Sequence, residues 1–119
     1  MKVEVHNVNN TLVAEVISSG VIIRDASDGS DIMGELYFAG SDRIIIHEKN
    51  LAAAFFDLKT GIAGEILQKF SNYRMRLAIV GDFGKYESES LKAFISESNR
   101  GKEVNFVASR DEAIMTLTY

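Results

Sequence analysis

An acid, a base and a hydroxyl group lie close together near the middle of the chain, in Asp57, Lys59 and Thr60, directly before Gly61. Thr60 precedes a stretch with helical spacing, so its hydroxyl can cap a helix whose N–H groups attract an anion. The stretch also follows a predicted strand, and open α/β folds bind ligands at the carboxyl ends of strands. These four residues are therefore the main candidates for a binding or phosphorylation site. Alternatively, Asp57 and Thr60 only satisfy helix N–H groups and Lys59 is solvated.

A second acidic residue, Asp82, lies in the run Gly81–Lys85 between a predicted strand and a predicted helix. The run resembles a phosphate loop only superficially, because a Walker A loop needs four residues between its glycines and this run has two. We interpret it as a strand-to-helix turn. If the strands before Asp57 and Asp82 are neighbours, Asp82 lines the same cleft as Asp57.

His47 ends another predicted strand, whereas His6 lies in a predicted hairpin and is given no role. A metal site needs three or four converging ligands, and the sequence has no H-E-x-x-H or comparable spacing. The chain also contains no cysteine, which excludes disulfides and thiolate ligands. We therefore expect no metal and no cofactor. His47 is interpreted as a surface or hydrogen-bonding residue, or as part of the Asp57 cleft.

Two pairs of residues are candidates for a partner surface. Phe55 and Phe56 anchor a loop in the core or, if exposed, form a hot spot for protein binding. Arg74 and Arg76 point to the same side of a strand if Met75 points to the other. Two like charges on a half-buried strand indicate an acidic partner, an anion or carboxylates of the same chain.

Composition excludes several classes of protein. The 119 residues carry a formal net charge of −4 and are 46% hydrophobic, which is typical of one soluble domain spanning residues 1–119. The acidic balance argues against a nucleic-acid binder. The longest apolar run, Leu51–Phe56, is too short to span a membrane and no export signal begins the chain. We therefore expect a cytoplasmic protein.

The hydrophobic pattern predicts a hairpin followed by alternating helices and strands. Alternating apolar residues flank Asn9-Asn10, a pair suited to a tight turn. Ser27–Asp31 can cap a helix over residues 28–39, and a short apolar run at Val21–Ile23 is a candidate for an extra strand. Further strands are predicted at 43–47, 75–80 and 104–107, with helices at 60–72, 88–99 and from Ser109 onward.

Strands that alternate with helices imply right-handed crossovers and a mainly parallel sheet. The opening hairpin adds an antiparallel part. The predicted fold is therefore α/β, with a single-layer mixed sheet, an N-terminal hairpin and parallel βαβ units on which helices pack.

This layout resembles the sulfate-transporter and anti-sigma-factor-antagonist (STAS) domain over roughly residues 43–107. The chain is still more similar to a bacterial family catalogued as domain of unknown function 4180. That similarity is carried by the runs Phe55-Phe56-Asp57-Leu58-Lys59-Thr60-Gly61, Ala63-Gly64-Glu65-Ile66-Leu67-Gln68-Lys69-Phe70, Leu77-Ala78-Ile79-Val80-Gly81-Asp82-Phe83 and Glu97-Ser98-Asn99-Arg100-Gly101.

The STAS resemblance implies a role for Thr60. In anti-sigma-factor antagonists, a serine directly before a glycine at this helix start is the phosphorylation switch and lies in the partner surface. Thr60 before Gly61 matches that place. Here, however, Leu58-Lys59 separates Asp57 from Thr60, one residue more than in the Asp-Ser-Ser/Thr-Gly run of those proteins.

These observations favour a regulatory or interaction module that docks a partner protein through the helix start at Thr60, with a small anion or phosphate modulating the contact. A homodimer using Phe55, Phe56 or Tyr119 would be another use of the surface. The alternative function is a small-ligand binder or enzyme with a cleft at His47, Asp57, Lys59 and Asp82. The sequence leaves open whether the protein is an enzyme.

Overall fold

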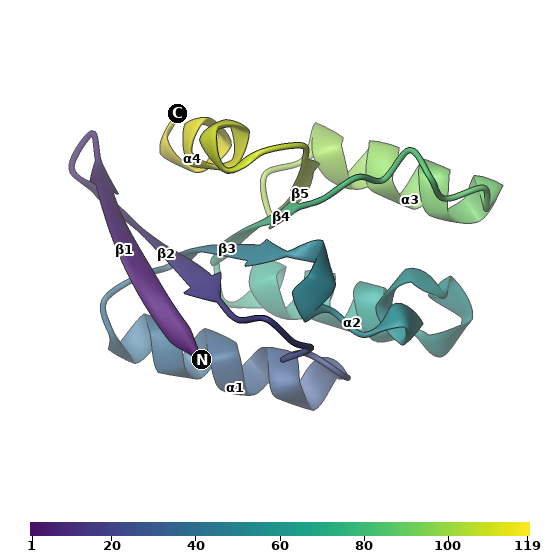
Figure 1. Ribbon diagram of the computed structural model, residues 1–119, viewed down its shortest axis with the longest axis horizontal. Coiled ribbons are helices and arrows are strands. Elements are labelled where there is room, and N and C mark those ends of the chain that lie inside the picture. Colours follow the sequence, from purple (N-terminus) through teal and green to yellow (C-terminus); the bar gives the residue numbers. More distant parts are fainter.

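The computed structural model describes residues 1–119 and has a five-stranded sheet in the order β1-β2-β3-β4-β5 (Figure 1). The strands are β1 (Lys2–Val8), β2 (Thr11–Ile17), β3 (Arg43–His47), β4 (Arg76–Val80) and β5 (Val104–Val107). β1 and β2 form an antiparallel hairpin, and the other neighbouring pairs are parallel. The predicted α/β class, with a hairpin and parallel βαβ units, is confirmed.

Four α-helices and three short 3-10 helices connect and follow the strands. They are α1 (Ala26–Phe38), α2 (Ile62–Asn72), α3 (Glu89–Arg100) and α4 (Arg110–Thr118), with η1 (Glu48–Asn50), η2 (Ala53–Phe56) and η3 (Leu58–Thr60) all between β3 and α2. Side-chain caps begin three of the α-helices: Asp25 for α1, Ser88 for α3 and Ser109 for α4. None of the helices is both long and apolar enough to cross a membrane.

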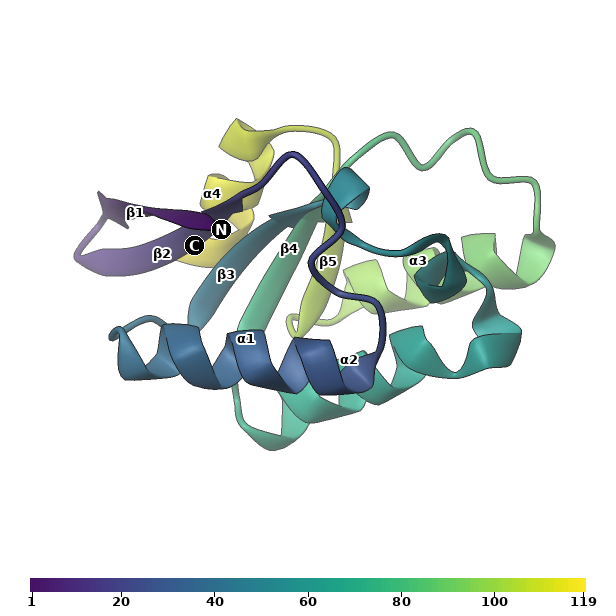
Figure 2. The same cartoon turned by 60° about the horizontal axis from the view of Figure 1, so that its bottom comes forward.

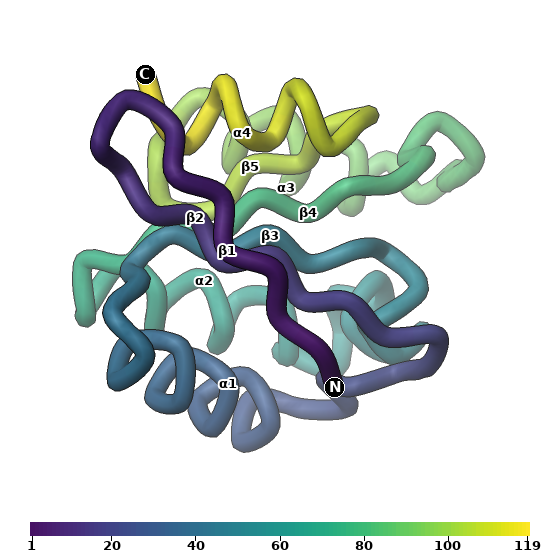
Figure 3. The backbone as a smooth tube through the Cα atoms, turned by 60° about the vertical axis from the view of Figure 1, so that its left-hand side comes forward, coloured from purple at the N-terminus to yellow at the C-terminus, as the bar shows by residue number.

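The helices are divided unequally between the two faces of the sheet. In Figures 1 and 2, α1 and α2 lie on one face and α4 lies on the other. The larger core, of 18 buried residues, includes Leu36, Ile66 and Phe106, and the smaller one, of six, joins Ile45 and Ala78 to the inner side of α4. Figure 3 shows the β1–β2 hairpin as the edge of the sheet, between α1 and α4. The central strands are therefore buried on both faces.

Three local expectations differ from the structure. Val21–Ile23 forms no strand, because only Ile23 makes an isolated bridge, to Leu51. Helix α2 begins at Ile62 after Gly61, whose φ of 77° ends the preceding 3-10 turn, so Thr60 is not the cap residue. Arg74 lies in a turn with φ 55°, before β4 begins at Arg76. The two arginines therefore do not share one side of a strand.

Candidate functional site

The loop before α2 brings Asp57, Lys59 and Thr60 together on the surface, and all three are exposed. Asp57 begins η3 by accepting a hydrogen bond from the backbone N–H of Lys59 at 3.2 Å. The Thr60 hydroxyl lies 2.7 Å from the carbonyl oxygen of Ala54 and 2.8 Å from that of Asp57. It also accepts from the N–H of Ile62 at 3.3 Å. Thr60 thus connects two 3-10 turns to the start of α2.

Phe55 and Phe56 pack between this loop and the core of the domain. Phe55 is buried, and its ring lies 4.9 Å from that of Phe56, edge to face. Phe56 stacks on Tyr86 at 4.9 Å, and Phe83 packs edge to face on Phe106 at 5.2 Å. Phe55 therefore cannot form part of a partner surface, because its side chain fills the core. Phe56 is half-buried in the same aromatic cluster.

Asp82 lies in a turn organised by Glu48. A Glu48 carboxylate oxygen accepts from the backbone N–H of Asp82 at 3.2 Å, and the carboxylate also contacts the Lys85 ammonium at 2.8 Å and accepts from the Tyr86 hydroxyl. Burial alone raises the pKa of Glu48, but the hydrogen bonds from these groups, that of Lys85 foremost, outweigh it and hold the pKa below its ordinary value. Burial, and then the hydrogen bond to Glu48, raise the pKa of Tyr86. The run Gly81–Lys85 is thus a structured turn tied to η1.

His47 lies on the α4 face of the sheet, on the same side of β3 as Ile45. Phe55 and Ala63, which flank the Asp57 loop, belong to the core on the opposite face. The structure therefore separates His47 from Asp57 and Lys59, and the four residues of the alternative cleft do not converge on one site.

Glu15 is the partner of His47 and was missed by sequence reasoning. It is fully buried, and its two carboxylate oxygens lie 2.6 Å from His47 Nε2 and 2.9 Å from His6 Nε2. Arg110 Nε, at the start of α4, lies 2.8 and 2.9 Å from the same oxygens. Burial by itself raises the pKa of Glu15, but the hydrogen bonds from its three partners outweigh burial and hold the pKa below its ordinary value. The hydrogen-bonding interpretation of His47 is confirmed.

A signal for Glu15 was present in the sequence. Its neighbours Val13, Ala14, Val16 and Ile17 place apolar residues on both faces of β2, a pattern typical of a strand that is covered on both sides. A carboxylate inside such a strand is buried and needs partners. His6 and His47 are distant in sequence, so only the sheet order brings them to it.

The Arg76 guanidinium donates hydrogen bonds to backbone carbonyls of the same chain. Its Nε donates to the carbonyl of Lys102 at 2.9 Å, and its Nη2 donates to that of Thr116 at 2.8 Å. The guanidinium on β4 therefore donates to backbone carbonyls, including one in the last turn of α4, and the carboxylates of Asp42 and Glu103 add an electrostatic attraction. Arg74 is exposed in its turn.

Two hollows on the surface lie away from the candidate residues. One, of about 450 Å³, is mainly apolar and lies between the C-terminal parts of α1 and α2, lined by Ser30, Met33, Gly34, Tyr37, Phe38, Tyr73 and Met75. The other, of about 410 Å³, lies beside α3 and is lined mostly by polar residues. Neither contains His47, Asp57, Lys59 or Asp82.

The fold and the exposed loop define a small mixed α/β domain whose candidate site is a surface and not a deep cleft. The sequence profile of the family described as domain of unknown function (DUF4180) matches residues 8–117, and the chain belongs to that family. No curated protein matches the chain. Among solved structures, the chain is similar to a candidate anti-sigma factor antagonist from Thermotoga maritima, with a TM-score of 0.49, 13% identity and coverage of 98% of this chain and 95% of that chain.

Proposed function

We propose that this domain is a cytoplasmic regulatory module that docks a partner protein through the α2 entry surface, defined as Asp57, Lys59, Thr60 and Gly61. The observation that carries the proposal is the position of the Thr60 hydroxyl. It is exposed to solvent, yet it holds the carbonyls of Ala54 and Asp57 and the first N–H of α2 in place. A chemical change at this one atom therefore alters the shape and the charge of the whole surface.

Phosphorylation of Thr60 is the change that fits this position. It removes the hydroxyl proton that now binds a carbonyl and adds a charge of about −1.5 to −2. The new charge lies beside the Asp57 carboxylate, which repels it, and beside Lys59 and the N–H groups of α2, which attract it. Either effect moves the loop away from its present arrangement. Docking is then regulated by the population of the two loop states.

The rigid support below the loop favours docking over a flexible linker role. Phe55 fixes η2 to the core, and Phe56 stacks on Tyr86 across the neighbouring turn. A preformed surface costs less ordering entropy on binding than a mobile one. A small anion, such as inorganic phosphate, would bind at the same helix start and compete with the partner.

A photo-crosslinking experiment tests the docking surface. A benzophenone amino acid is placed at Lys59 and, as a control, at Gln68 on the exposed part of α2, and cells that naturally contain the protein are irradiated. We expect position 59 to capture one defined protein that position 68 does not capture. Identical crosslinked products from both positions would contradict docking at the α2 entry surface. If position 59 instead captured a second copy of this chain, the surface would serve self-association and not a different partner protein.

The captured partner is then purified and its affinity measured. Thr60→Glu places a negative charge on the surface, and we expect the dissociation constant to change by at least about tenfold. Ser71→Glu adds the same charge at the other end of α2 and leaves the affinity unchanged. Equal affinities of Thr60→Glu and wild type would remove the switch, while crosslinking at Lys59 would still support docking.

A further inference from the structure

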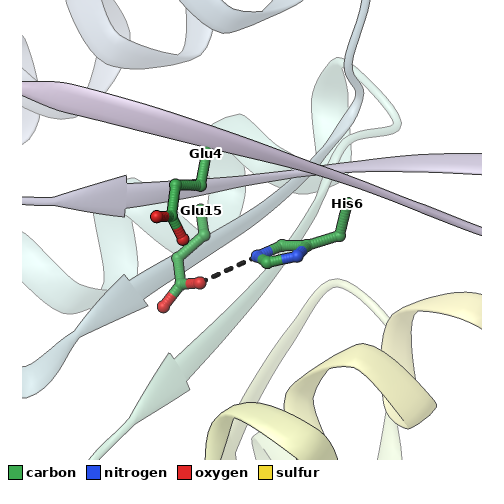
Figure 4. Close-up of side chains that lie close together, drawn as sticks. All are labelled: Glu4, His6 and Glu15. Atoms are coloured by element: carbon green, nitrogen blue, oxygen red, sulfur yellow. Dashed lines mark hydrogen bonds and ion pairs between the residues drawn. The ribbon is translucent and has the colours of Figure 1, made fainter.

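We propose that Glu4, His6 and Glu15 bind a divalent transition-metal ion of the Zn²⁺ type on the α4 side of the β1–β2 hairpin. Figure 4 shows the three side chains converging from the two strands. Their ligand atoms all lie within 4.8 Å of one another. The site is separate from the α2 entry surface, which lies with the core on the opposite face of the sheet.

The strand register brings these side chains together. Glu4 of β1 is paired directly with Glu15 of β2 in the antiparallel ladder. His6 lies two residues after Glu4, so it projects from the same face of the sheet. The arrangement therefore follows from the hairpin itself and does not depend on a mobile loop.

The two carboxylates of Glu4 and Glu15 favour a bound cation at this position. Like charges directly opposite each other on neighbouring strands destabilise a sheet, and here one of the two carboxylates, that of Glu15, is fully buried. Arg110 neutralises part of this charge at Glu15, and the Lys2 ammonium lies 4.0 Å from the Glu4 carboxylate. A metal ion between Glu4 and Glu15 would remove the repulsion that remains.

The ligand types select the class of metal. An imidazole with two carboxylates suits Zn²⁺ and related transition metals, whereas Ca²⁺ and Mg²⁺ prefer oxygen ligands alone. Three protein ligands would leave a fourth position for water. The side chains of Glu4 and His6 are 44% and 24% exposed, so an ion can reach them from solvent.

Only a small rearrangement is needed for coordination. In a tetrahedral zinc site, with metal–ligand distances of about 2.1 Å, neighbouring ligand atoms lie ~3.4 Å apart. His6 Nε2 and Glu15 Oε1 are already 2.9 Å apart. His6 would carry its proton on Nδ1 and present Nε2 to the metal, and a rotation of the half-exposed Glu4 side chain would complete the set.

Two neighbouring residues would position the buried ligand. His47 Nε2 lies 2.6 Å from Oε2 of Glu15, and Arg110 Nε bridges both oxygens, at 2.9 Å from Oε2 and 2.8 Å from Oε1. Outer hydrogen bonds of this kind orient a ligating carboxylate, and Arg110 would exchange its contact with Oε1 for the metal while keeping its contact with Oε2. His47 and Arg110 are therefore positioning residues and not ligands.

Titration of the untagged, chelator-treated protein with Zn²⁺, followed by calorimetry, tests the proposal. We expect one Zn²⁺ per chain, and we expect Glu4→Gln and His6→Gln each to weaken the affinity by at least about tenfold. Glu65→Gln, which removes an exposed carboxylate on α2, serves as the matched control and should bind Zn²⁺ like wild type. Millimolar Mg²⁺ should not compete.

Two further measurements distinguish a loss of metal binding from a loss of folding. Circular dichroism without metal verifies that each variant is folded, and Zn²⁺ should raise the melting temperature of wild type but not of the two ligand variants. Zn²⁺ should also shift the imidazole NMR signals of His6. The proposal is overturned if wild type takes up no Zn²⁺, if Glu4→Gln and His6→Gln bind as tightly as the control, or if Mg²⁺ displaces Zn²⁺.

Discussion

Arg43 and Arg76 lie side by side on β3 and β4, and both donate hydrogen bonds to carbonyls in the last turn of α4. Arg43 reaches the carbonyl of Leu117, and Arg76 reaches that of Thr116. The C-terminal end of a helix carries a partial negative charge, which two neighbouring cations complement. Burial lowers the pKa of Arg76, and the charge of Arg43 lowers it further. The pair therefore attaches the short α4 to the sheet.

We expect Arg76→Met to loosen this attachment. Methionine keeps most of the apolar stem but cannot donate to Lys102 or Thr116, so the free energy of unfolding should fall by about 2 kcal/mol, as for other charged hydrogen bonds. Arg74→Gln, at the exposed turn, should change it by no more than about 0.5 kcal/mol. Urea denaturation measures both. Equal effects of the two substitutions would show that Arg76 has no special role in holding α4.

Gly81 is expected to tolerate no side chain. A Cβ atom at this position would lie 2.7 Å from the Cβ of Glu48 and 2.6 Å from its Oε1. Gly81→Ala should therefore destabilise the fold by about 1–3 kcal/mol, the range for overpacked sites. In Gly84→Ala the nearest atom, Asp82 Oδ1, would be 3.6 Å away, so thermal unfolding should be close to that of wild type. A neutral Gly81→Ala would mean that the turn does not pack on Glu48.

The sequence predicted the helices and strands better than the residues of the site. Apolar runs such as Ile44–Ile46 identify buried strands, and Ser109 with Glu112 identifies the start of a helix, because both signals are local. The partners of Glu15 and Arg76 are set by the order of the strands and by the face that α4 covers. Neither is encoded in local spacing, so sequence reasoning missed both the partners of Glu15 and the attachment of Arg76 to α4.

The position of Thr60 shows a similar limit. Its place in the sequence predicted a helix cap, and its hydroxyl does accept from Ile62. Leu58–Thr60 form the separate 3-10 turn η3, however, and Gly61 then provides the left-handed conformation before α2. A pattern that reads as one helix start is in fact a 3-10 turn followed by a helix.

The Glu48 carboxylate, with its contacts to Asp82, Lys85 and Tyr86, makes the free energy of unfolding depend on pH in the acid range. The pKa of Glu48 is lower in the folded protein than its ordinary value of 4.5. Its contribution to stability is therefore complete above pH 4.5 and is lost as the pH falls through the folded value. We expect Glu48→Gln to be less stable than wild type at pH 7 and to lose less stability than wild type on acidification. Glu65→Gln is the control, and parallel pH profiles for wild type and Glu48→Gln would contradict this role.

Arg74 offers a site where the fold can be stabilised. It adopts a φ of 55° in the turn between α2 and β4, a conformation that costs a residue with a Cβ atom about 1–2 kcal/mol. Arg74→Gly removes this strain but increases the freedom of the unfolded chain by about 0.4–1 kcal/mol. We expect a net gain of about 0.5–1 kcal/mol in the free energy of unfolding, measured by urea denaturation. Arg74→Ala keeps the Cβ atom and should give no such gain, so a stabilised alanine variant would show that the benefit comes from removing the charge and not from the backbone conformation.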